Sequence, residues 1–218
     1  LIYRAAKLLQ SHTKTPYGCQ ITLNKSIPTG GGLGGGSSNA ATTLLTLNHL
    51  WQTQLTSAEL ASLGRQIGAD IPVFILGKNA WAEGVGDELT PVSLPRRWYL
   101  IIHPPCHVNT STLFQHPDLP KNNTRIGRKT ILPPNSTNHF QRLACELHPP
   151  IAEALTWLNQ HTKAQLTGTG SCVFAAFKQQ EEAQNVAQLA PTSWTTKVCA
   201  GINTSPTHTQ LEEFSFTT

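Results

Sequence analysis

The chain has 218 residues, 39% of them hydrophobic, which is enough for a globular core in one large domain or two small ones. Its net charge of +4 is small and its basic residues are mostly scattered, so the composition argues against a nucleic-acid partner. No apolar run approaches the ~18 residues of a membrane span, and the widely spaced cysteines include no Cys-x-x-Cys pair, so we expect neither a membrane partner nor a metal site. Reduced thiols of this kind indicate the cytoplasm.

The first stretch of the chain predicts an amphipathic helix over residues 1–9 and then a strand over residues 18–28. The helix has no cap or turn before it, and the chain contains no methionine. We therefore expect the sequence to begin partway into its first domain. The strand prediction rests on partial alternation at Ile21 and Leu23, and this strand would lead into the loop that follows.

The loop over residues 28–38 is rich in glycine and precedes a predicted helix. Every residue from Gly30 to Gly36 except Leu33 is glycine, and apolar residues then recur at helical spacing: Ala40, Ala41, Leu44, Leu47, Leu50 and Trp51. A flexible backbone at a helix N-terminus presents free amides and the positive end of the helix dipole, which together stabilise a phosphate. A surface linker is the alternative, but linkers are rarely followed by a well-patterned helix.

The common phosphate-binding motifs do not fit this loop. A Walker loop needs a lysine after its second glycine, whereas Gly35 is followed by Gly36 and Ser37. Gly30, Gly32 and Gly35 satisfy G-x-G-x-x-G, but in so glycine-rich a run the match is nearly automatic. A dinucleotide site would also need an acidic residue about 20 positions further on, and that position is Leu55.

The next helix is predicted by its start and stop signals. Thr56 and Glu59 form a capping box, and Gly68 ends the helix. Asp70 follows directly and precedes Pro72, a residue favoured in the first turn of a helix. From spacing alone, Asp70 is explained equally well as an N-cap and as a functional carboxylate.

A domain boundary is expected near residue 95, where prolines and arginines cluster between residues 91 and 97. This divides the chain into domains at residues 1–95 and 96–218. Before the boundary we expect a hairpin over residues 80–89, and after it a buried strand over residues 98–102.

The second half of the chain alternates predicted helices and strands. A turn and helix over residues 108–114 precede a loop at 116–138, and a helical stretch at 138–161 is broken by Pro149 and Pro150. The run from Thr167 to Ser171 is a second glycine turn between strands at 164–166 and 172–177. A helix at 181–189, a strand at 196–200 and a polar tail at 201–218 follow. As a tight turn, the second glycine run needs no function, and Phe114 is explained equally well as a core residue.

Three motifs in the same chain resemble those of the GHMP small-molecule kinases. They are residues 28–41, the run Gly-Ala-Asp-Ile-Pro-Val-Phe at 68–74, and the run Leu-Thr-Gly-Thr-Gly-Ser-Cys-Val-Phe at 166–174. Within that family they are most similar to the kinases of a cytidine-diphosphate-linked methylerythritol. The resemblance implies an α+β fold of two domains: an N-terminal ATP-binding domain like domain 2 of ribosomal protein S5, incomplete here, and a C-terminal ferredoxin-like domain.

The resemblance also assigns site residues. It implies that ATP and Mg²⁺ bind at the glycine loop, that Asp70 is the catalytic base, and that Thr110 and Phe114 lie beside the cytidine end of the substrate. Gly168 and Thr169 would lie beside the phosphates. The ATP-binding residues that it implies are Pro28, Thr29, Gly30, Gly31, Gly32, Leu33, Gly34, Gly35, Gly36, Ser37 and Ser38.

The sequence is compatible with several functions. Another GHMP kinase, acting on homoserine, mevalonate or a sugar, would share the loop, and so would a nucleotide-binding domain without turnover. The family pairs its aspartate with a lysine in an N-terminal motif that these 218 residues do not contain. We expect weak or absent catalysis if the chain is complete and an active enzyme if it is a fragment. In either case we expect a monomer or homodimer and a small-molecule substrate.

Overall fold

The computed structural model describes residues 1–84, 86, 88–119 and 138–215, and they form two compact units. The first unit contains Leu1–Lys25, Gly34–Leu94 and the chain from Ile202 onward, and the second contains Ser26–Leu33 and Pro95–Gly201. The change at residues 94 and 95 lies close to the boundary expected from the sequence. The expected ranges 1–95 and 96–218 remain a prediction, because the contacts assign the loop at 26–33 and the C-terminal stretch differently.

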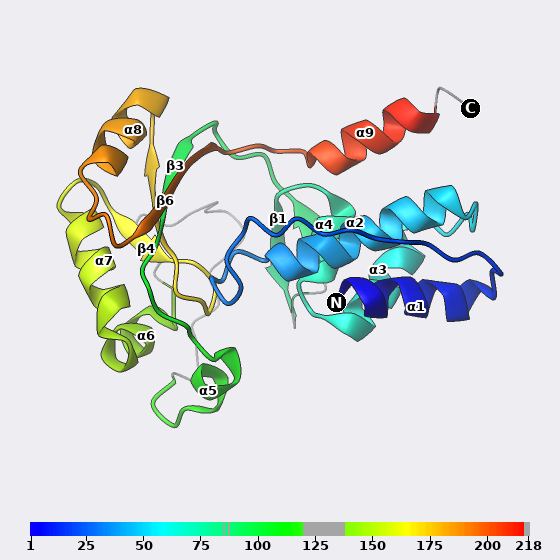
Figure 1. The fold of residues 1–218 in the computed structure, drawn as a ribbon, viewed down its shortest axis with the longest axis horizontal. Coiled ribbons are helices and arrows are strands. Elements are labelled where there is room, and N and C mark those ends of the chain that lie inside the picture. Colours follow the sequence, from blue (N-terminus) through cyan, green and yellow to red (C-terminus); the bar gives the residue numbers. More distant parts are fainter. Residues whose placement is uncertain (85, 87, 120–137, 216–218) are drawn as a thin grey trace. The chain divides into compact units, whose positions relative to one another are not determined.

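Helices make up most of the first unit (Figure 1). They are α1 (Ile2–Thr13), α2 (Gly35–Leu50), α3 (Ser57–Ile67), α4 (Ile71–Leu76) and α9 (Pro206–Ser215), with the hairpin strands β1 (Ala80–Glu83) and β2 (Glu88–Pro91). The apolar faces of α1, α2, α3 and α4 meet in one core, whose largest fully buried side chains are Leu9, Leu44, Leu60, Ile71 and Ile75. Because Ile71 and Ile75 are one turn apart, α4 presents a single face to this core.

Local signals set the ends of α3 as the sequence predicts. The Thr56 hydroxyl accepts from the Glu59 amide at 3.2 Å, and the Glu59 carboxylate accepts from the Thr56 amide at 2.8 Å. Gly68 makes the last helical hydrogen bond, to Gly64 O at 3.0 Å, and its extended backbone then ends the helix. Gly64 lets α4 pack closely, because a Cβ there would overlap the side chain of Ile71.

A four-stranded antiparallel sheet forms the centre of the second unit. Its strands are β3 (Trp98–His103), β4 (Ala164–Leu166), β5 (Val173–Phe177) and β6 (Thr195–Ala200), in the order β4-β5-β3-β6. The helices are α5 (Thr110–Gln115), α6 (Gln141–Leu147), α7 (Pro149–Asn159) and α8 (Gln180–Gln188). The sequence of elements is β-α-β-β-α-β, with α5, α6 and α7 in the first crossover, and this is the ferredoxin-like arrangement that we expected.

Alternate residues of β3 establish which face of the sheet is covered. Leu100 and Ile102 are fully buried, and they share one core with Ile151 and Leu158 of α7 and Ala183 of α8. Figure 1 shows α7 and α8 on the same side of the sheet. Pro149 and Pro150 occupy the first turn of α7, which separates it from α6 as predicted.

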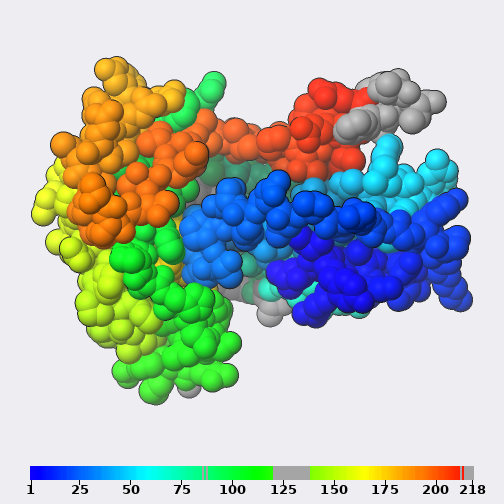
Figure 2. Space-filling view, viewed as in Figure 1, coloured from blue at the N-terminus to red at the C-terminus, as the bar shows by residue number. Residues whose placement is uncertain are grey.

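Two predicted elements are wrong. Residues 18–28 form no strand, and residues 16–25 lie exposed on the face shown in Figure 2, with Ile21 44% and Leu23 49% accessible. The alternation there was too partial to bury one face, and a strand also requires a paired neighbour. The polar tail is in fact partly helical, since α9 begins at Pro206, a residue suited to a first helical turn.

None of the described helices is both long and apolar enough to cross a bilayer.

Candidate functional site

The first half of the glycine loop is held by the second glycine turn, and both belong to the second unit. The Thr167 hydroxyl donates to Gly31 O at 2.7 Å, and the amide of Cys172 donates to the same carbonyl at 3.2 Å. The amide of Ser171 donates to Gly30 O at 3.3 Å. Two stretches that are some 136 positions apart in the chain therefore form one structure.

These bonds determine which way the loop amides face. In a trans peptide group the carbonyl and the N–H point in opposite directions. The second glycine turn donates hydrogen bonds to the carbonyls of Gly30 and Gly31. The amides of Gly31 and Gly32, on the opposite sides of the same peptide groups, therefore point away from that turn. Neither amide donates to any other residue in the described part of the chain. Successive free amides of this kind form a concave anion site.

Only glycine fits at the point of closest approach. Gly32 has φ +74°, and a Cβ there would overlap Thr167 O. A Cβ on Gly170 would overlap the backbone between Gly31 and Gly32. The glycines of the two motifs thus allow backbone to pack directly on backbone.

The second half of the loop belongs to the first unit and leads into α2. Gly34 is the N-cap in a left-handed conformation, with φ 66°, and no side chain caps the helix. The first-turn amides of α2, including those of Gly35, Gly36 and Ser37, have no acceptor within the helix. Together with the helix dipole they favour an anion.

Asp70 is placed near the start of α2 by the packing of α4. The ring of Phe74 lies against Gly34, where a Cβ would be 2.7 Å from Phe74 Cζ. Asp70 precedes Phe74 by four residues, so it lies about one helical turn, or ~5.4 Å along the axis, from that contact. Asp70 is exposed, as a group that must reach a substrate requires.

The Asp70 side chain is not an N-cap, which was one of the two explanations that the sequence left open. Asp70 occupies the N-cap position, but its carboxylate makes no capping hydrogen bond. Its backbone is helical, with φ −84° and ψ −9°, whereas a capping side chain requires an extended backbone. The turn is closed instead by the Ile71 amide, which donates to Gly68 O at 3.2 Å.

The residues expected beside the substrate lie together in the second unit. The hydroxyls of Thr169 and Thr110 are 3.2 Å apart and hydrogen-bonded. Phe114 is 60% exposed on α5, and its ring meets that of Phe140 edge to face at 4.8 Å. Gly168, with φ 47°, contacts the backbone of Gly32. Phe114 is therefore not an ordinary core residue, and its open face can stack on a base.

Sequence reasoning missed the residues that support the second turn. The Asn138 side chain donates to Gly168 O at 2.6 Å and to Leu166 O at 3.1 Å. No local signal marked Asn138, because it ends a stretch rich in asparagine and proline. Cys172 lies against Gly31, and burial, followed by the nearby Cys106, raises the pKa of its thiol to about 12. This thiol is therefore neutral at physiological pH.

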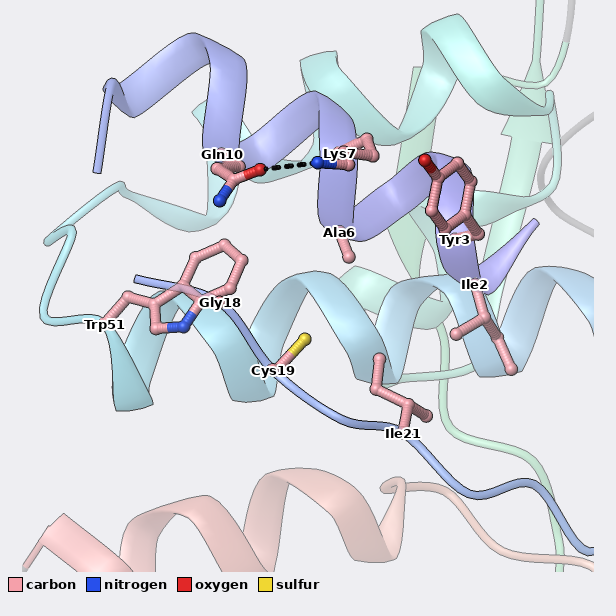
Figure 3. Close-up of a pocket in the computed structure, with 9 residues that line it drawn as sticks. All are labelled: Ile2, Tyr3, Ala6, Lys7, Gln10, Gly18, Cys19, Ile21 and Trp51. Atoms are coloured by element: carbon pink, nitrogen blue, oxygen red, sulfur yellow. Dashed lines mark hydrogen bonds between the residues drawn. The ribbon is translucent and has the colours of Figure 1, made fainter. Parts of the chain in front are cut away.

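A separate pocket of about 320 Å³ lies in the first unit, beside α1 (Figure 3). Its lining is mostly apolar, and Lys7 donates to Gln10 at 3.1 Å along its edge. None of the site residues predicted from the sequence lines it. The described residues also contain no group of three acidic, histidine or cysteine side chains able to hold a metal ion.

Two family models match separate parts of the chain, and known proteins match nearly all of it. The model of the GHMP kinases N terminal domain matches residues 1–78, and that of GHMP kinases C terminal matches residues 130–192. The 4-diphosphocytidyl-2-C-methyl-D-erythritol kinase of Pseudoalteromonas atlantica is 46% identical over 97% of this chain and 74% of its own length. The chain belongs to the GHMP kinase family. The kinase of the same name from Shewanella putrefaciens is 48% identical over the same shares.

Solved structures agree with this membership. A crystal structure of a 4-(cytidine 5'-diphospho)-2C-methyl-D-erythritol kinase matches with a TM-score of 0.78 and 30% identity, over 92% of this chain and 78% of that chain. The Methanococcus jannaschii mevalonate kinase matches with a TM-score of 0.55 at 14% identity, which shows a shared fold alone. The expected α+β GHMP kinase fold is confirmed. The chain is an ATP-dependent kinase of the branch that contains these methylerythritol kinases.

Proposed function

We propose that this kinase transfers the γ-phosphoryl group of ATP to the 2-hydroxyl of 4-diphosphocytidyl-2-C-methyl-D-erythritol, in the methylerythritol phosphate route to isoprenoid precursors. The observation that carries this proposal is the pair of unpartnered amides at Gly31 and Gly32 in a chain 46% identical to kinases of that name. Homoserine, mevalonate and sugar kinases of the same family are less favoured, because the similar kinases carry the methylerythritol name over 97% of the chain.

Each half of the glycine loop has a distinct part in the proposal. The free amides of Gly31 and Gly32 and those in the first turn of α2 bind phosphate oxygens, which lowers the energy of the charge that develops during transfer. Pro28, Thr29, Leu33 and the remaining loop glycines shape this backbone. Gly168 and Thr169 lie beside the phosphates of the substrate, while Thr110 and Phe114 bind its cytidine end.

Asp70 orients the acceptor hydroxyl and receives its proton as the new bond to phosphorus forms. A carboxylate is a weak base toward an alcohol, so the proton moves late in the transfer and orientation is a large part of the effect. Since no cap holds the Asp70 carboxylate, we infer that the substrate hydroxyl fixes its position.

Mg²⁺ fits the site as an ion carried by the nucleotide. No cluster of three ligating side chains exists among the described residues, so the phosphates would supply most of its ligands. We expect the hydroxyls of Ser37 and Ser38, in the first turn of α2, to supply further ligands to the ion. When bound, the ion neutralises phosphate charge and holds the phosphoryl group in line. We also propose that the enzyme is cytoplasmic and works as a monomer or homodimer.

The test is ADP release by the protein supplied with Mg-ATP and the cytidine-diphosphate methylerythritol, compared with an Asp70→Asn variant. We expect kcat to fall by about 10²–10⁴-fold, as for the loss of a general base, while ATP still binds. Because Asp70 is exposed, stability should change by no more than about 0.5 kcal/mol.

Homoserine and mevalonate serve as control acceptors. Equal turnover of either one would contradict the proposed substrate. If the protein binds nucleotide but releases no ADP with any of these acceptors, it is instead a nucleotide-binding protein without turnover. An Asp70→Asn variant with undiminished kcat would remove Asp70 from the mechanism and leave the reaction itself standing.

A further inference from the structure

Ser171 has a buried hydroxyl that contacts neither the glycine loop nor any other described part of the candidate site through a hydrogen bond. Its side chain is fully buried, and its Oγ has no hydrogen-bond partner among the described residues. By contrast, the buried hydroxyl of Thr43 in α2 donates to Asn39 O at 2.8 Å. An unpaired hydroxyl in the interior costs free energy, so its presence calls for a partner in another state of the protein.

The backbone contacts of Ser171 point to a candidate for that partner. Its own amide donates to Gly30 O at 3.3 Å, and the next amide donates to Gly31 O at 3.2 Å. Both bonds are at or beyond the long end of the usual range, whereas the Thr167 hydroxyl reaches Gly31 O at 2.7 Å. The contact between the turn and the loop is therefore loosest at Gly30. That carbonyl has a second lone pair, which a hydroxyl can use.

We propose that Ser171 is a positioning residue for nucleotide binding. When the loop closes on a phosphate, the Ser171 hydroxyl donates to the carbonyl of Gly30. This inference rests on the proposed function, which places a nucleotide phosphate at the amide of Gly31.

The reason is geometric, because that amide and the Gly30 carbonyl belong to one peptide group. A donor on the carbonyl orients and polarises the N–H on the opposite side of the group, so it strengthens the bond to the phosphate. Gly30, at φ +79°, gives the peptide group the freedom to tilt.

The proposal predicts effects of opposite sign in the free and bound states. The unpaired hydroxyl destabilises the free protein, and the new hydrogen bond stabilises the complex. Removing the hydroxyl should therefore raise stability and weaken nucleotide binding together. A residue with a merely structural role would lower stability, and it would change affinity only through misfolding.

The experiment uses Ser171→Ala, which removes the hydroxyl, and Ser171→Cys, which replaces it with a larger group that is only a weak donor. Thermal unfolding is measured without ligand, and the dissociation constant of a non-hydrolysable ATP analogue with Mg²⁺ is measured by calorimetry. We expect Ser171→Ala to unfold at a higher temperature than the wild type, and both variants to bind the analogue about three- to tenfold more weakly, as for the loss of one hydrogen bond. The KM for ATP should rise by the same factor, with the KM for the alcohol unchanged.

Ser193→Ala is the matched control, because Ser193 is an exposed serine in the same unit. It should leave all of these measurements unchanged. Normal affinity in Ser171→Ala, lower stability in both variants, or failure of both to fold would each overturn the inference, since each contradicts an unpaired hydroxyl that is satisfied on binding. A wild-type protein that does not bind the analogue would overturn the proposed function, and this inference with it.

Discussion

Gly32 is a residue at which both backbone conformation and close packing exclude a side chain. Its φ of +74° lies in the left-handed region, and the space where a Cβ would project is taken by Thr167 O. A left-handed conformation alone costs an alanine about 1–2 kcal/mol, before any overlap with the turn. The two features reinforce each other, because a rotation of φ that relieved the strain would also separate the loop from the turn.

We therefore predict that Gly32→Ala lowers the free energy of unfolding by at least about 1–2 kcal/mol and abolishes nucleotide binding. Urea unfolding and calorimetry with the ATP analogue measure the two effects. Gly18→Ala is the control, since no atom lies within 4 Å of the added Cβ, and its effect should stay within about 0.5 kcal/mol. Equal stability of the two variants would contradict the packing of the loop on the turn.

Among the elements, α3 begins with a complete capping box formed by Thr56 and Glu59. Hydrogen bonds from the Thr56 backbone, and then from its hydroxyl, lower the pKa of Glu59 from its usual value of 4.5. Ionised Glu59 is thus favoured in the folded state. Its contribution to stability is present above pH 4.5 and is lost as the pH falls through the lowered folded pKa.

Thr56→Ala should cost about 1 kcal/mol at pH 7, as for the loss of a helix N-cap. Urea unfolding at pH 7 and again near pH 3 should show a smaller difference between this variant and the wild type in acid, because protonated Glu59 no longer accepts both bonds. Glu153→Gln, an exposed substitution on α7, should not alter the pH dependence. A difference that is the same at both pH values would show that the carboxylate is not part of the cap.

The sequence predicts an element well when its signals are local. The capping box of α3 and the break at Pro149 are both confirmed, because each depends on residues within a few positions. The strand predicted at 18–28 failed for the opposite reason, since pairing depends on a distant neighbour. The missing cap at Asp70 depends on one backbone angle that residue types do not specify.

At the scale of the whole molecule, Asn203 joins three distant parts of the first unit. Its side-chain oxygen accepts from the Asn79 side chain and from the Leu94 amide, both at 2.8 Å, and its amide donates to Leu94 O at 3.0 Å. The chain re-enters the first unit at residue 202, directly before this residue. The hydrogen bonds therefore fix the point at which the C-terminal stretch returns.

Asn203→Ala should remove all three bonds and lower stability by about 1–3 kcal/mol. Limited proteolysis should then cut between residues 200 and 206 earlier than in the wild type. Asn203→Asp keeps the acceptor and loses only the donor, so we expect a smaller effect. If both variants resist proteolysis as the wild type does, the C-terminal stretch is held by its other contacts.

The candidate site combines what the sequence can and cannot predict. The three motifs locate both glycine runs and Asp70, because the types of residue in each motif are enough to indicate its chemistry. The fold as a whole determines that residues 26–33 pack with residues 167–172. It also determines that Asn138 and Ser171 support this contact. No local pattern contains that information.

The hydrogen bond from Thr167 to Gly31 spans 136 positions of the chain, and this separation affects how the protein is made. At a synthesis rate of about 5–20 residues per second, the loop leaves the ribosome roughly 7–27 s before the turn that holds it. During this interval the carbonyls of Gly30 and Gly31 have no turn to hold them. The half of the nucleotide site that depends on the turn therefore forms only after residue 172 has left the ribosome.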